Sequence, residues 1–413
     1  MPEAEERPIV LPRSHEPLPG GGAPTSSRRV TVPESEIIQR CEDLYYDVTF
    51  SSVRAWKAAH PGRLAIGHMP VYVPREIIHA AGMLPVGIVG GGDQLEIIRG
   101  DAFFQSYICH IPRSVIELGI SGRMDCIDGM LFPSICDVVR NLSGMWKLQF
   151  PEKYVRYLDL PQNFDPEIGG RFYRLELEGL RRDLEALGGE KITDDRLRES
   201  IETYNEHRRW MNELYDRRAK SPWKLPASEV YLLTRAANLL PVEAHTAMIQ
   251  DYLAWVETQE RPIKDKSRII VVGAFCEQPP LGLVQTLERS GCYLVDDDFI
   301  LGTRWIVGDI STSGDPIEAL VMAFLHQSRE AAVRYSESEE KGKALLQRIE
   351  ETGAEGVIFC APSFCDPALL DQPMLQGALD RAGIPYTSFK YAENTGQFQV
   401  IREQTGTFSD SIK

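Results

Sequence analysis

The pattern Pro-Ser-apolar-Cys-Asp occurs twice in this chain, and this repetition restricts the possible folds more than any other feature. The first copy reads GMLFPSICD from Gly129, and the second reads GVIFCAPSFCD from Gly356. Earlier in each copy, LAIGHMP (64–70) corresponds to IIVVGAF (269–275). Because segments that lie far apart in the chain correspond in the same order, we expect a duplicated domain.

Short apolar segments alternate with segments of helical periodicity in both copies. This alternation is typical of a parallel sheet with helical crossovers. Helices that end at Ala81-Gly82 and Ser290-Gly291 occupy equivalent places. The predicted strands are residues 64–70, 83–89, 126–132 and 154–160 in the first copy and 268–275, 292–298, 356–362 and 385–392 in the second. We therefore predict an α/β fold with two similar doubly wound parallel-sheet domains and a helical middle section.

The chain of 413 residues is long enough for these two domains and for additional elements. A Pro- and Gly-rich segment at the start predicts a flexible N-terminal tail, and residues 33–60 have helical spacing. We divide the chain into a tail (1–32), a helical extension plus the first α/β domain (33–165), a helical section (166–262) and the second α/β domain (263–413).

The charge balance excludes several classes of partner. Lys and Arg number 45 against 60 Asp and Glu, a net charge of −15, which disfavours nucleic acid and anionic membrane as general partners. The sequence contains no apolar run of the length, roughly 18 residues, that a membrane-spanning helix needs. It also lacks the basic-then-apolar order of a signal peptide at its start, so we expect a cytosolic protein.

Eight cysteines are present, and none lies in a CxxC pair, which excludes a local zinc finger. Cys136 and Cys365 follow predicted strands and directly precede helices, where backbone N–H groups and the helix dipole favour the thiolate that ligates iron. If the two domains face each other, both sulfur atoms reach one cleft. A third ligand is then required, for which Cys109 is the first candidate and Cys276 a competitor.

The alternative for every cysteine is a small buried hydrophobic side chain. We expect that role for Cys126, Cys292 and Cys360, because each lies in or at the start of a predicted strand. For Cys136 and Cys365 the repeated placement argues against coincidence, but core packing stays open.

Several segments resemble the benzoyl-CoA reductase and 2-hydroxyacyl-CoA dehydratase family. The matching segments, which lie within about 60–410, are YVPREIIHAAGMLPV (72–86), the segment around Cys109, PSICDVVR (133–140), ITDDRLRESIETYNEHRR (192–209), DDDFILGTRW (296–305) and FCDP (364–367). The segment 388–413 is most similar to the C-type subunits of ATP-dependent benzoyl-CoA reductases.

The resemblance implies a [4Fe–4S] cluster held by Cys109, Cys136 and Cys365, which fits the preference of such clusters for thiolates. It implies an anaerobic core subunit that reduces the ring of benzoyl-CoA to a cyclohexadiene-carbonyl-CoA. The implied partners are a homologous core subunit, the aryl-CoA substrate, ferredoxin as electron donor and ATPase activator subunits. The implied assembly is a heterotetramer. The sequence has no phosphate-binding loop ending in GK[ST], which is consistent with ATP hydrolysis on another chain.

Two alternatives remain: a subunit of a 2-hydroxyacyl-CoA dehydratase, which is a lyase, and a non-catalytic subunit that relays electrons in the same complex. The resemblance makes Glu76 a candidate acid near the acyl group, although a first-turn carboxylate also complements the helix dipole. His68, at the end of a predicted strand, is a candidate proton donor or a structural histidine. We expect Asp296–Asp298 to form a solvated loop rather than a cation site.

Overall fold

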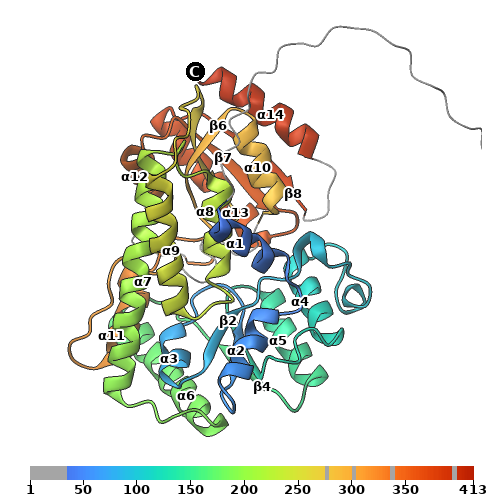
Figure 1. Ribbon diagram of the computed structural model, residues 1–413, viewed down its shortest axis with the longest axis vertical. Helices are drawn as coiled ribbons and strands as arrows, with labels where there is room; N and C mark the ends of the chain where they lie inside the picture. Colours follow the sequence, from blue (N-terminus) through green and yellow to red (C-terminus); the bar gives the residue numbers. More distant parts are fainter. Residues whose placement is uncertain (1–34, 275–278, 300–303, 335–339, 393–397) are drawn as a thin grey trace, which may run out of the picture. The chain divides into compact units, whose positions relative to one another are not determined.

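Each copy of the repeat forms a four-stranded parallel sheet in the computed structural model (Figure 1). The strand orders, β2-β1-β3-β4 and β6-β5-β7-β8, are the same topology, so the predicted α/β fold is confirmed. The strands are β1 (Ala65–His68), β2 (Leu84–Gly87), β3 (Gly129–Pro133), β4 (Tyr154–Leu158), β5 (Ser267–Val272), β6 (Cys292–Asp297), β7 (Gly356–Pro362) and β8 (Tyr386–Tyr391). The structure describes residues 35–274, 279–299, 304–334, 340–392 and 398–413.

The two sheets correspond down to single hydrogen bonds. After β3, the N–H of Ser134 donates to the carbonyl of Leu158 at 2.9 Å, and after β7 the N–H of Ser363 donates to the carbonyl of Tyr391 at 2.7 Å. In each case the preceding proline pairs with that same acceptor residue on the neighbouring strand. The Pro-Ser pair therefore ends the strand in the same way in both copies, which explains why the repeat contains it.

The glycines that end the helices before β2 and β6 also correspond. Gly82 and Gly291 have φ angles of +72° and +89°, a left-handed conformation that glycine adopts at little cost. A Cβ atom on Gly82 would lie 2.2 Å from the side chain of Arg63. Both positions therefore favour glycine, and the equivalence predicted from the sequence is confirmed.

The second sheet is covered on both faces, as its apolar sequence requires. Along β5, Ile269 and Val271 belong to the large hydrophobic core of the chain, whereas Ile270 and Val272 belong to a smaller core. The smaller core includes residues of α12 (Lys343–Thr352) and α13 (Asp366–Ala382). Because successive strand residues point to opposite faces, both faces of this sheet are buried.

The other helices flank the sheets or connect them. They are α1 (Glu36–Tyr46), α2 (Ser51–Ala59), α3 (Arg75–Ala80), α4 (His110–Ile120), α5 (Asp137–Gln149), α6 (Arg171–Leu187), α7 (Asp194–Lys220), α8 (Ala227–Ala236), α9 (Val242–Glu257), α10 (Leu281–Arg289), α11 (Pro316–Gln327) and α14 (Phe398–Ser411). Short helical turns cover Gly92–Gln94, Gly100–Phe103 and Pro166–Gly170. Among the described residues, no helix combines the length and apolar character needed to cross a bilayer.

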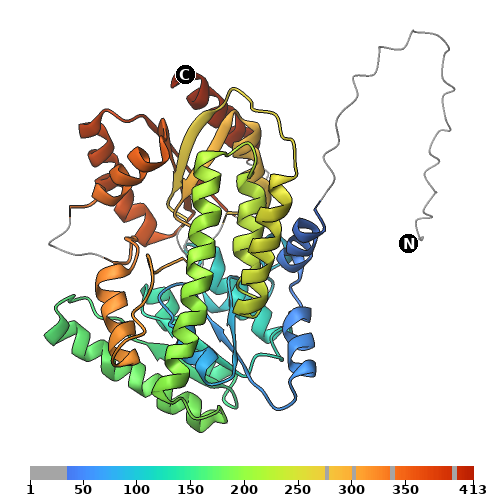
Figure 2. The same cartoon turned by 60° about the vertical axis from the view of Figure 1, so that its left-hand side comes forward.

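The longest helix, α7, links the two halves. It packs against α3 beside the first sheet and against β6 of the second sheet, and Figure 2 shows it running past both. Thr193 caps the start of this helix, because its side chain accepts a hydrogen bond from the N–H of Arg196. The helical section thus joins both domains by side-chain packing as well as by the chain itself.

The expected solvated loop at Asp296–Asp298 is wrong. Asp296 and Asp297 end strand β6, and Asp297 is only 3% exposed. Arg218 of α7 and Arg304 approach the Asp297 carboxylate at 2.7 and 2.9 Å. Buried carboxylates need such partners, and Arg218 reaches Asp297 from a helix far away in the sequence. For this reason the local sequence did not indicate the burial.

The helical extension also differs in detail from its expected form. Its periodicity predicts continuous helical structure over 33–60, but α1 and α2 are separated at Asp47, whose carboxylate accepts from the N–H groups of Thr49 and Ser51 at 2.8 and 2.7 Å. This local capping competes with continuation of the helix. The predicted tail, 1–32, lies outside the described residues, and the domain boundaries stay predictions.

Candidate functional site

Three cysteines from three separate segments line one cavity of about 480 Å³. Cys109 and Cys136 belong to the first half of the chain, and Cys365 belongs to the second. The cavity therefore lies where the two halves meet. It is lined by Met69, Pro70, Ile108, Cys109, Ile111, Pro112, Ile135, Cys136, Asp137, Val138, Val139, Ala332, Val333, Lys341, Phe364, Cys365, Asp366, Pro367, Leu370, Asp371 and Met374.

Cys136 and Cys365 have equivalent positions, because each is the residue that caps the N-terminus of the helix after a strand. Cys136 precedes α5, which follows β3, and Cys365 precedes α13, which follows β7. In both sheets that strand lies next to the first strand, on the side opposite the second strand. This is the switch point at which ligands bind in open α/β sheets.

Cys109 reaches the same cavity from the N-terminus of a third helix. It caps α4, whose first residue is His110. Cys109 is part-buried, whereas Cys365 is 4% exposed. Three helix N-termini, each with a partial positive charge, thus bring a sulfur atom to one space.

Two opposing effects act on the pKa of the Cys136 thiol. Burial raises the pKa of Cys136, and the nearby sulfur of Cys365 acts in the same direction. The N–H groups of Val138 and Val139 at the start of α5 act in the opposite direction and lower this pKa. Because burial is the larger effect, Cys136 without a cationic partner is a thiol at neutral pH. A positive iron centre would add the missing stabilisation of the thiolate.

The donor set fits an iron–sulfur cluster. Thiolate sulfur is the usual protein ligand of such clusters, and each iron takes its own cysteine. Within the part of the chain that the structure describes, no three His, Cys, Asp or Glu side chains converge to hold a single metal ion. A cluster does not require that convergence, because its ligands bind different irons. The residues that could hold it are Cys109, Cys136 and Cys365.

The wall of the cavity is mostly apolar, with one ion-paired lysine. Lys341 lies 3.0 Å from Asp371 and 3.4 Å from Glu330, and it donates to the carbonyl of Ala331. Its charge is therefore already compensated. Apolar walls lower the local polarity, which strengthens electrostatic interactions inside the cavity. No local pattern in the sequence indicates Lys341 or its neighbours at 332–333, because only the tertiary fold places them here.

Glu76 lies elsewhere, in a buried ion pair. Its side chain in the first turn of α3 is 3% exposed, and Arg208 of α7 approaches it at 2.6 Å. Arg208 also donates to Asn205, and the hydroxyl of Ser200 donates to the Glu76 carbonyl. Glu76 is not among the described residues that line the thiol cavity. The geometry gives it a structural partner, and its catalytic role stays a prediction.

His68 ends β1, as predicted, and is 2% exposed. Burial, with a smaller contribution from the charge of Arg75, lowers the pKa of His68 to about 3. The imidazole is therefore neutral at physiological pH. Like Glu76, it does not appear among the described lining residues, and its role as a proton donor stays a prediction.

Four other cysteines, for which the sequence suggests a role, fall into two groups. Cys126, Cys292 and Cys360 are 7%, 0% and 0% exposed in the hydrophobic core, so the prediction of core packing for them is confirmed. Burial raises the pKa of Cys292 to about 11, as expected of an inert thiol. Cys276, the competing third ligand, lies outside the described residues.

Comparisons with known proteins agree with the resemblance that the motifs indicate. The model of the family described as 2-hydroxyglutaryl-CoA dehydratase, D-component, matches residues 70–412. The chain is 59% identical over 380 residues to the C-type subunit of benzoyl-CoA reductase from Thauera aromatica, covering 92% of this chain and 98% of the relative.

More distant relatives are named as dehydratase subunits. The beta subunit of (R)-phenyllactyl-CoA dehydratase from Clostridium sporogenes is 27% identical, with 85% of this chain and 92% of the relative covered. The beta subunit of (R)-2-hydroxyglutaryl-CoA dehydratase from Acidaminococcus fermentans is 26% identical, with 85% and 93% covered. All three relatives are thus named as single subunits of larger enzymes.

The buried pair between Glu76 and Arg208 leads to a stability prediction. We expect Glu76→Leu to lower the free energy of unfolding by about 3–5 kcal/mol, because the Arg208 guanidinium then stays buried without its partner. The double variant Glu76→Leu/Arg208→Met removes both charges, and we expect it to recover most of the loss. Chemical denaturation of the two single variants and the double variant measures this coupling.

The matched control is Glu36→Leu, which removes an exposed first-turn carboxylate of α1. We expect it to cost about 0.3–1 kcal/mol, the contribution of the helix dipole alone. If Glu76→Leu costs no more than this control, the ion pair has no structural role. Loss of turnover in a Glu76→Gln protein of normal stability would then support the catalytic alternative.

Proposed function

The chain belongs to the family of 2-hydroxyglutaryl-CoA dehydratase D-components, and we propose that it is a core subunit of an ATP-dependent benzoyl-CoA reductase that carries a [4Fe–4S] cluster. The reaction is the reduction of the aromatic ring of benzoyl-CoA to a cyclohexadiene-carbonyl-CoA. The electrons come from ferredoxin through an ATPase activator. The single observation that carries the cluster assignment is the meeting of Cys109, Cys136 and Cys365 in one cavity.

The alternative role of these cysteines as core packing does not account for their arrangement. Each of the three caps a different helix, and two of them occupy equivalent places in the duplicated domains. A side chain that only fills space does not need a helix N-terminus. A thiolate ligand does benefit from one, because N–H groups and the helix dipole stabilise negative charge.

The degree of similarity favours a reductase over a dehydratase. Identity to the benzoyl-CoA reductase chain from Thauera aromatica is 59%, against 27% and 26% for two of the dehydratase subunits. The fold and the cysteine cavity alone fit both reactions. The choice between ring reduction and dehydration of a 2-hydroxyacyl-CoA therefore rests on this difference in identity.

The protein supplies binding and an environment for electron transfer. Cys109, Cys136 and Cys365 would each hold one iron, and a bound cluster supplies single electrons at low potential. The thioester end of the substrate would approach this cavity.

Assembly with other chains is part of the proposal. Phe364, Leu370 and Met374 line the thiol cavity and are nevertheless 50%, 74% and 44% exposed. A homologous core subunit that covers these side chains would close the cavity against water. We propose that this subunit and the ATPase activator complete a heterotetramer. A non-catalytic electron-relay role for the present chain is the remaining alternative within the same complex.

The cluster assignment predicts which cysteines retain iron. We expect Cys109→Ala, Cys136→Ala and Cys365→Ala each to remove most of the iron from the anaerobically purified complex, since each removes one of three thiolates. Cys126→Ala is the matched control, because Cys126 is a buried cysteine of the same half and does not line the cavity. Iron is measured by colorimetric assay and by the visible absorption of the cluster.

Full iron occupancy in the Cys365→Ala protein would contradict the assignment. Loss of iron in Cys276→Ala, with iron retained in Cys109→Ala, would show that Cys276 and not Cys109 is the third ligand. We expect the control Cys126→Ala to keep its iron and to lose only the packing energy of one buried sulfur, about 1 kcal/mol.

The proposed reaction predicts a stoichiometric consumption of ATP and electrons. The native complex should convert benzoyl-CoA to the cyclohexadiene product only with reduced ferredoxin and ATP, and electron uptake should rise in proportion to product. A dehydratase, in contrast, recycles its electron and needs only catalytic amounts of both. Dehydration of a 2-hydroxyacyl-CoA by the complex, without net electron uptake, would identify the lyase instead.

A further inference from the structure

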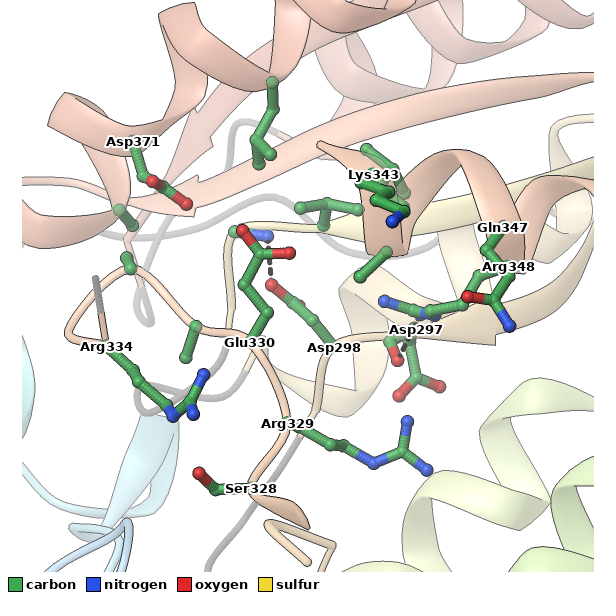
Figure 3. A pocket seen from close by; sticks show the side chains of 18 of the residues that line it. Asp297, Asp298, Ser328, Arg329, Glu330, Arg334, Lys343, Gln347, Arg348 and Asp371 are labelled. Carbon is green, nitrogen blue, oxygen red and sulfur yellow. Dashed lines mark hydrogen bonds between the residues drawn. The ribbon is translucent and has the colours of Figure 1, made fainter. Parts of the chain in front are cut away.

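A second cavity, of about 520 Å³, lies in the second half of the chain (Figure 3). Val272 and Gly273 at the end of β5 and Asp297 and Asp298 at the end of β6 form one wall. Residues 328–334 and helix α12 form other walls. The cavity therefore lies at the carboxyl edge of a parallel sheet, where ligands of α/β proteins bind, and its volume is within the usual range for a ligand site.

Arg329 extends into this cavity from the segment 328–334 (Figure 3). Its backbone is fixed, because its N–H donates to the carbonyl of Trp305 at 2.8 Å. Among the described residues, no carboxylate lies within ion-pair distance of its guanidinium, and its buried Nε has no hydrogen-bond partner. Burying a guanidinium without an anion is costly, so an external anion would stabilise it.

The nearest carboxylates are already bound by other arginines. Arg348 approaches Asp296 at 2.6 Å, and Arg218 and Arg304 approach Asp297 at 2.7 and 2.9 Å. These arginines therefore compensate both carboxylates without any contribution from Arg329.

Arg329 keeps its charge in this setting. Burial, together with the charges of Arg304 and Arg348, lowers the pKa of Arg329 to about 10. Because this value lies well above 7, the guanidinium is a cation at neutral pH. It is thus a part-buried positive charge at the wall of a ligand-sized cavity.

Asp298, which follows Asp296 and Asp297 in the sequence, has its own hydrogen-bond partners. Asp298 accepts hydrogen bonds from the N–H groups of Gly273 and Ala274 at 2.7 and 3.1 Å. Burial, with a smaller contribution from the charge of Asp297, raises its pKa to about 6. The backbone therefore holds the Asp298 carboxylate. Asp298 thus does not serve as the partner of the Arg329 guanidinium.

Acidic residues at other walls are paired as well. Glu330 and Asp371 pair with Lys341 at 3.4 and 3.0 Å. Glu340 pairs with Arg381 at 3.0 Å. These contacts hold the three carboxylates to cations other than Arg329.

Helix α12 contributes a second cation to the cavity. Lys343 is an exposed lining residue for which the described residues provide no ion pair. Glu351, further along the same helix, accepts a hydrogen bond from Gln347 at 2.7 Å. Lys343 and Arg329 thus both present positive charge to this space, and an anionic ligand would satisfy them together.

This cavity adjoins the thiol cavity. Ala332 and Asp371 line both, so the two cavities share part of their wall. A long ligand with an anionic end and a reactive end can therefore occupy both cavities at once. A small free anion would use only the cavity that contains the cations.

We propose that the second cavity binds the phosphate groups of the CoA ester, with Arg329 as the principal contact and Lys343 as a second cation. The guanidinium forms two parallel hydrogen bonds with phosphate oxygens, and this geometry suits a chain without a glycine-rich phosphate loop. The pantetheine arm then passes Ala332 and Asp371, and the thioester enters the thiol cavity. The choice of CoA rests on the proposed function, whereas the preference for a phosphate ester rests on the charges alone.

Binding of CoA to the purified native complex, measured by anaerobic calorimetry, tests this site without turnover. We expect Arg329→Gln to weaken CoA binding by about ten- to a hundredfold, the effect of one charge-assisted pair. Arg329→Lys should recover part of the affinity. Arg182→Gln, which changes an exposed arginine of α6 outside the cavity, is the matched control and should leave binding unchanged. Melting temperatures of all variants check that folding is intact.

Two fragments of CoA distinguish the possible sources of the phosphate. We expect ADP to compete with CoA in an Arg329-dependent manner and to bind more weakly, and pantetheine to be insensitive to Arg329→Gln. ADP that displaces CoA from the Arg329-dependent site and binds there more tightly than CoA would show a nucleotide site and overturn the CoA assignment, whereas ADP that binds without displacing CoA reports the ATPase activator. Equal CoA affinity in wild type and Arg329→Gln would overturn the site itself. Neither result depends on whether the complex reduces benzoyl-CoA or dehydrates another ester.

Discussion

Two buried arginines of one helix tie the two sheets together, and the thiol cavity depends on this connection. Arg208 of α7 binds Glu76 at the start of α3, beside the first sheet, and Arg218 binds Asp297 at the end of β6 in the second. The thiols of the cavity come from different halves, so they share one space only while the halves keep a fixed relation. Because buried charges are strongly destabilising without their partners, both contacts resist separation of the halves.

The duplicated strand-to-helix junction explains how the cavity receives its sulfur atoms. A parallel strand must be followed by a crossover helix, and the helix begins at the same sheet edge at which the strand ends. Each copy therefore presents a helix N-terminus to the space between the halves. Placing cysteine at that position in both copies yields two thiols in one cavity, and the start of α4 adds Cys109.

Much of the fold could be predicted from the sequence because the signals for it are local. Apolar runs such as the one before Pro133, and helix-ending glycines such as Gly82, depend only on neighbouring residues. The equivalent placement of the two repeated cysteines could be predicted from the repeat. The burial of Asp297 could not be predicted, because Arg218 reaches it from another part of the chain. The unpaired state of Arg329 is likewise a result of tertiary packing, and no local pattern marks it.

The most direct test of the central proposal is diffraction from anaerobically grown crystals of the native complex, recorded on both sides of the iron absorption edge. The account predicts an anomalous peak from a four-iron cluster in the cavity between the halves, with the sulfur atoms of Cys109, Cys136 and Cys365 bound to three of its irons. Iron bound elsewhere in this chain, or a cavity in which these three cysteines are free thiols beside an iron-containing partner, would contradict it.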